Sequence, residues 1–145
     1  LSKRMLELSR SLADSCSGEL HILSCWEFAY ESALRGNAFI KVPEEEIQFK
    51  LEEAKSKHLD ALNGLIAASG IDGNTQLHHL RGKAETMIPA FVSEHGIDIL
   101  VMGTVARTGI AGFMFGNTAE NIIQQLSCSL LALKPQGFVS PVKAY

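Results

Sequence analysis

The residues that could do chemistry in this sequence gather between positions 103 and 118, in GTVARTGIAGFMFGNT. A strand-like apolar run ends just before this stretch, and a helix-like pattern follows it. The first N–H groups of a helix lack internal partners, and the helix dipole favours an anion there. A strand, a glycine-rich loop and a helix start in this order are typical of a phosphate-binding loop.

A phosphate in this loop would be held largely by backbone groups. Gly116 would let it approach the main chain closely, and the amides of Asn117 and Thr118 would donate hydrogen bonds to it. The Thr118 hydroxyl and the Arg107 guanidinium would add further hydrogen bonds, which are bidentate for arginine. The candidate ligand-binding residues are therefore Gly103, Thr104, Ala106, Arg107, Gly116, Asn117 and Thr118.

The same loop also fits a purely structural role. Asn117 is a favoured capping residue, and Glu120 stands three residues on, as in a capping box. Glu120 would also repel a phosphate, and Ala106 lacks the freedom of glycine to adopt a positive φ. The bulky residues 113–115 would fill the site or cover an apolar ligand. The residues alone favour the cap by a small margin, and both interpretations stay open.

Motifs for catalysis are missing from the sequence. It contains no Ser-His-Asp set, no G-x-S-x-G, no H-E-x-x-H and no G-x-x-x-x-G-K-[ST]. Without a P-loop lysine or a clear carboxylate pair for Mg²⁺, efficient phosphoryl transfer is not expected. We therefore expect a protein that is not an enzyme, with weak ATP hydrolysis as the alternative.

Two further places in the sequence carry side chains that often serve function. His78 and His79 are adjacent, so on a strand they face opposite sides and do not easily share a metal. We expect each to be solvated or hydrogen-bonded. Trp26 ends an expected strand at the carboxyl edge, where α/β proteins bind ligands, but packing in the core is its favoured role.

Composition and charge exclude several classes of protein. The 145 residues suit one domain, and 46% hydrophobic with 20% charged residues is a globular balance. A net charge of −3 without a basic cluster argues against a nucleic-acid partner. No apolar run approaches the roughly 20 residues of a membrane span. Three scattered cysteines (Cys16, Cys25 and Cys128) without metal spacing indicate reduced thiols in a cytoplasmic protein.

Hydrophobic periodicity predicts helices and strands in alternation. The expected helices lie at 1–13, 43–70, 83–96 and around 119–126, and the expected strands at 19–28, 75–82, 97–104 and 129–134. Residues 29–42 should form a loop with a short helical turn, and Pro89 should bend its helix or mark a late start. Strands alternating with amphipathic helices predict an α/β fold with a mostly parallel sheet.

Residues 100–135, LVMGTVARTGIAGFMFGNTAENIIQQLSCSLLALKP, resemble the universal stress protein family. Its nucleotide-binding members carry Gly, two residues, Gly, nine residues, Gly, and then Ser or Thr. Gly103 and Gly116 match the first and third glycines. Ala106 stands at the second glycine, and Asn117 stands where Ser or Thr is expected.

Three other stretches, ELHILSCWEF, LRGKAETMIPAF and LALKPQGFVSPV, resemble the tandem, E-type branch of that family. The resemblance implies one family domain over 1–138 with a short tail at 139–145, as the second repeat of a longer chain. It also implies a flavodoxin-like, adenine nucleotide alpha hydrolase-like open sheet of order 3-2-1-4-5, with helices on both faces. The first strand, with its nucleotide-contacting Asp, would be missing from this sequence.

The resemblance further implies a role in the stress response, by ligand binding, protein association or both. The implied ligand is ATP or another adenine nucleotide. An ATP-binding, slowly hydrolysing domain, a purely structural repeat and a binder of an apolar metabolite remain the alternatives. The implied partner is a sister repeat or a second copy, paired through the last strand from Ser129 to Lys134.

Overall fold

The computed structural model describes residues 2–36, 41–71, 74–104 and 117–138 as alternating helices and strands. In chain order the elements are α1 (Ser2–Ser15), β1 (Leu20–Trp26), α2 (Glu31–Arg35), α3 (Glu44–Ser69), β2 (Thr75–Arg81), α4 (Ala84–His95), β3 (Ile99–Gly103), α5 (Asn117–Ile123) and β4 (Ser129–Leu133). The predicted α/β alternation is confirmed, and the strands begin and end within two residues of the expected positions.

All strand pairing among the described residues is parallel. β1 pairs with β2, from Leu20 opposite Thr75 to Trp26 opposite Arg81. β3 pairs with β4 from Ile99 to Gly103. Within the described ranges no ladder joins β1 to β3, so these strands form two separate pairs. Each of the four strands therefore has one edge without a neighbouring strand in this part of the chain.

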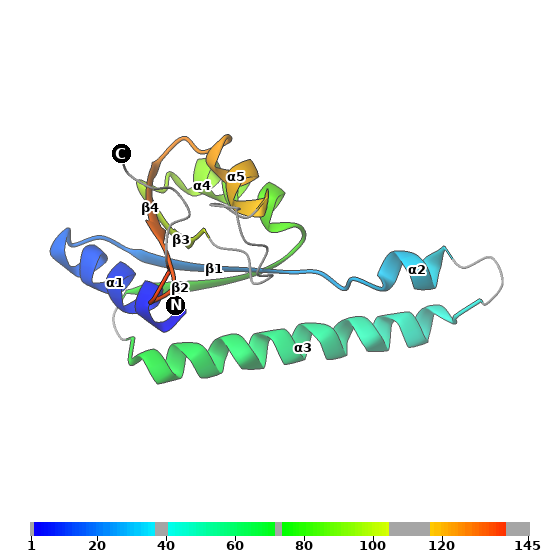
Figure 1. Ribbon diagram of the computed structural model, residues 1–145. Helices are drawn as coiled ribbons and strands as arrows, with labels where there is room; N and C mark the ends of the chain where they lie inside the picture. Colours follow the sequence, from blue (N-terminus) through cyan, green and yellow to red (C-terminus); the bar gives the residue numbers. More distant parts are fainter. Residues whose placement is uncertain (1, 37–40, 72–73, 105–116, 139–145) are drawn as a thin grey trace.

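Helices cover both faces of the strands, as Figure 1 shows: α1 and α3 lie on one side, and α4 and α5 on the other. On the first side, Leu6 of α1 packs with Leu20 and Ile22 of β1, and the second half of α3 adds Leu62 and Leu65 to this cluster. On the second side, buried side chains come from both helices: Phe91, Val92, Ala119 and Ile122.

Helix boundaries follow local signals, with two corrections to the sequence-based expectation. α3 ends at Gly70, which adopts φ +60° as a left-handed C-cap. α4 begins at Ala84 and contains Pro89. The alternative that Pro89 marks a late start of this helix is therefore wrong. α5 ends at Ile123, and Leu126 lies beyond the helix, because the chain turns at residues 124–125 before β4.

Candidate functional site

The structure places both ends of the candidate loop. Gly103 is the last residue of β3, and Thr104 follows it at the carboxyl end of the strand. Asn117 and Thr118 open α5 and are exposed. The other predicted site residues, Ala106, Arg107 and Gly116, lie outside the described residues, as do residues 113–115.

Asn117 is the first residue of α5 and not the residue before it. The residue before α5 lies outside the described part of the chain. Glu120 lies in the first turn of this helix and is exposed, so its negative charge is near any anion bound at the helix start.

Thr104 has the most unusual environment of the predicted site residues. Its side chain is buried, with 1% of the residue exposed, and its backbone N–H donates to the carbonyl of Leu133 over 3.3 Å. The structure gives its hydroxyl oxygen no hydrogen-bond partner among the residues described. An unsatisfied buried polar group costs about 1–3 kcal/mol, so the Thr104 hydroxyl needs a hydrogen-bond partner from outside the described residues.

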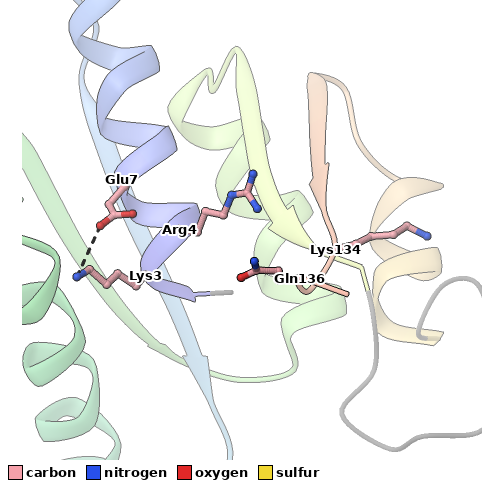
Figure 2. Close-up of a pocket in the computed structure, with 5 residues that line it drawn as sticks. All are labelled: Lys3, Arg4, Glu7, Lys134 and Gln136. Carbon is pink, nitrogen blue, oxygen red and sulfur yellow. Dashed lines mark ion pairs between the residues drawn. The ribbon is translucent and has the colours of Figure 1, made fainter. Parts of the chain in front are cut away.

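A cavity of about 370 Å³ lies at the same edge, lined by Lys3, Arg4, Glu7, Lys134 and Gln136 (Figure 2). Lys134 directly follows β4, just as Thr104 follows β3. Lys3 pairs with Glu7 over 3.8 Å, and the Lys134 ammonium lies 4.1 Å from the ring centroid of Phe138. In Figure 2 the Lys134 side chain extends away from the other four side chains, so the lining presents two cations of α1, Lys3 and Arg4, against the carboxylate of Glu7. This is a small excess of positive charge, which favours an anion.

Sequence reasoning missed this cavity. Its lining joins the start of α1 to the chain beyond β4, which are far apart in the sequence and meet only in the fold. The signal that could have drawn attention to it is the pair of basic residues, Lys3 and Arg4, in the first turn of the first helix, where a helix dipole disfavours cations.

The remaining candidates take structural positions. Trp26 is 8% exposed and packs with Ile47 and Leu51 of α3, so the predicted core role is confirmed. His78 and His79 each lie within hydrogen-bond distance of another histidine. In the described ranges no group of three or more His, Cys, Asp or Glu side chains could hold a metal ion.

The cysteines are free thiols in the structure. Cys16 is exposed, Cys25 and Cys128 are partly buried, and none of the three forms a disulfide. Burial raises the pKa of the Cys25 thiol, which keeps it protonated and less reactive. None of the helices described is long and apolar enough to cross a membrane.

The sequence profile of the Universal stress protein family matches residues 1–134. The chain belongs to the universal stress protein family. Universal stress protein E of Photorhabdus laumondii is 31% identical over 147 residues, which cover 99% of this chain and 45% of that relative. This chain spans less than half the length of the E-type universal stress proteins that it matches.

Solved structures of universal stress proteins share the fold. A putative universal stress protein from Pseudomonas aeruginosa UCBPP-PA14 superimposes with a TM-score of 0.59 at 29% identity, over 86% of this chain and 37% of that one. The universal stress protein from Archaeoglobus fulgidus in complex with dAMP gives a TM-score of 0.52 at 16% identity, over 92% and 87% of the two chains. At that identity the second likeness shows the fold alone.

Proposed function

We propose that this universal stress protein domain is a cytoplasmic, non-enzymatic module of the stress response that binds a phosphate-bearing ligand and associates with a second domain. The observation that carries the proposal is the buried Thr104 hydroxyl, which has no partner among the described residues and lies at the carboxyl end of β3. In open α/β sheets, ligands bind in the crevice outside these strand ends.

The charges at this edge support an anionic ligand. Lys3 and Arg4 bring positive charge to the cavity beside β4, and Glu7 is the one carboxylate in its lining. The structurally similar protein from Archaeoglobus fulgidus was solved with dAMP. An adenine nucleotide is therefore the ligand class that we propose for this chain.

We propose that ATP binding is weak. Ala106 and Asn117 stand where nucleotide-binding family members carry Gly and Ser or Thr, and Glu120 adds a negative charge in the first turn of α5. Each lost charge-assisted hydrogen bond is worth roughly 1.5–3 kcal/mol. Two such losses lower affinity by about two to four decades. Hydrolysis has no support from any residue described at this edge.

Replacing Thr104 with valine tests the site, because valine keeps the shape and removes the hydroxyl. We expect the dissociation constant for adenine nucleotides in the full-length protein to rise about tenfold, the value of one hydrogen bond to a charged group. Equilibrium dialysis with labelled ATP and dAMP measures it. The Thr104→Ser variant is the matched control and should bind as the wild type does. If the Thr104→Val variant binds these nucleotides as tightly as the wild type does, the proposed site is refuted.

For the sheet, we propose the order β2, β1, a further parallel strand, β3 and β4, which is the order 3-2-1-4-5 when the further strand is counted as the first. The inner edges of these two strands are unpaired within the described ranges, and unpaired edges invite other chains. The 145-residue chain produced alone should therefore melt at a lower temperature than the full-length protein, and with less cooperativity. Circular dichroism would show this, and cooperative melting of the isolated chain as a monomer would contradict it.

The outer edge of β4 is the association surface that we propose, with a sister repeat or a second copy as the partner. β4 pairs only with β3 among the described strands. We expect Leu131→Lys to weaken the association, because it places a charge on an apolar strand. Sedimentation velocity and thermal melting of the full-length protein measure the effect. Leu77→Lys on β2, the opposite outer strand, is the control, and an unchanged Leu131→Lys protein would count against this surface.

A further inference from the structure

The five histidines of the sequence form two groups, one on each face of the β1–β2 pair. Side chains alternate along a strand, so His78 and His79 of β2 face opposite sides. On the α4 side, His21 Nδ1 lies 3.1 Å from His78 Nε2, and His95 lies beside them with a ring-centroid distance of 5.6 Å to His78. On the α3 side, His58 Nδ1 lies 2.9 Å from His79 Nε2.

Two imidazole nitrogens at this distance form a hydrogen bond whose existence depends on the protonation state of the two rings. It needs an N–H on one ring and a lone pair on the other. The bond can form when both rings are neutral or when one is charged. When both rings are imidazolium, both facing nitrogens carry protons, so the hydrogen bond is lost and two positive charges face each other.

His58 occupies a special position in the apolar stripe of α3. Toward the start of the helix, Ile47 and Leu51 are buried against Trp26, the last residue of β1. Toward its end, Leu62 and Leu65 pack on the cluster at the start of the same strand. Along α3, the His58–His79 bond therefore lies between these two apolar clusters.

We propose that His58 and His79 form a proton-sensitive latch between α3 and β2, which holds the helix on the sheet near neutral pH and opens when both rings are protonated. Trp26 reports on this latch directly. Its indole ring stacks on His79 with centroids 5.8 Å apart and an interplanar angle of 14°, and it belongs to the cluster that α3 covers.

The charges around the latch determine the direction of its response. His79 faces His58 and Lys55 of α3, and it carries no carboxylate partner in the described structure. Arg81, two residues along the same face, is engaged by Glu31. Burial, followed by the charges of His58 and Lys55, lowers the pKa of His79.

The folded state therefore favours neutral His79, whereas the unfolded chain takes up protons near the ordinary pKa of about 6.5. The stabilisation of the folded state by neutral His79 is present above about pH 6.5 and is lost as the pH falls through the lowered pKa of His79.

On the other face of the β1–β2 pair, burial, followed by the charges of His21 and His95, lowers the pKa of His78, and Glu19 opposes this shift. No carboxylate opposes the shift at His79 on the α3 side, among the described residues.

Trp26 fluorescence tests the latch in the full-length protein, with the Trp26→Phe variant as the background. Between pH 7.5 and 5.0 we expect the Trp26 emission to fall and shift to longer wavelength, with a midpoint below about 6.5. His79→Gln keeps a hydrogen-bonding side chain that does not titrate, so the transition should be lost. His78→Gln, on the opposite face, is the matched control and should retain it.

A transition that survives in His79→Gln, or its absence from the wild type, would overturn the proposal. If His79→Gln does not fold, the ¹⁵N NMR spectrum of the wild-type imidazoles decides instead. We expect one facing nitrogen of the His58–His79 pair to carry the proton near neutral pH, and His79 to titrate below its ordinary range. Titration of His79 as an exposed histidine would refute the latch.

Discussion

Replacing Ala106 with glycine and Asn117 with serine together is expected to raise the affinity of the full-length protein for ATP about hundredfold, if each change restores one charge-assisted hydrogen bond of about 1.5 kcal/mol. Glycine at 106 permits a positive φ, which lets the loop wrap a phosphate. Serine at 117 adds a hydroxyl at the start of α5, where the helix dipole favours an anion. Isothermal titration with ATP measures the change.

The matched control for this gain is a pair of identical exchanges away from the loop ends, Ala132→Gly on β4 and Asn121→Ser later in α5. We expect this control protein to bind ATP as the wild type does. If the double exchange at 106 and 117 leaves the dissociation constant unchanged, these two departures from the family motif are not what limits binding.

Ile122→Ala is expected to destabilise the full-length protein by about 2–5 kcal/mol, because it removes a fully buried side chain and leaves a cavity. Ile122 is 1% exposed and lies on α5, whose neighbour across the same face of the sheet is α4. Urea unfolding measures the loss. Ile123→Ala, the same exchange one residue later at a partly buried position, should cost less. Equal losses in the two variants would show that α5 does not pack as described.

The alternation of elements could be predicted because hydrophobic periodicity differs between helices and strands. The apolar run at 97–104 predicted β3, and the stripe that includes Ile47 and Leu51 predicted the buried face of α3. Their boundaries depend on caps and turns, so they are less well determined: α5 ended before Leu126 because the chain turns at residues 124–125.

The candidate site could be predicted only in part. Gly103, Thr104 and the start of α5 were located by the order of strand, loop and helix. The burial of the Thr104 hydroxyl depends on packing, and the cavity beside Lys134 depends on contact between opposite ends of the chain. Neither leaves a periodic signal in the sequence.

The histidines show the same limit. Strand alternation predicted that His78 and His79 face opposite sides, and the structure confirms it. Their partners could not be predicted, because His58 comes from α3, and His21 comes from the neighbouring strand in a register fixed by tertiary pairing.

The central claim is that the sheet edge at the carboxyl ends of β3 and β4 binds a phosphate-bearing ligand but binds ATP weakly. Titration of the wild-type, full-length protein with ATP tests this claim most directly. We predict saturable binding with a dissociation constant well above micromolar, weakened further by Thr104→Val and by Gly116→Val. Micromolar or tighter binding that Gly116→Val abolishes would contradict the claimed weakness, and no saturable binding of any adenine nucleotide would contradict the site itself.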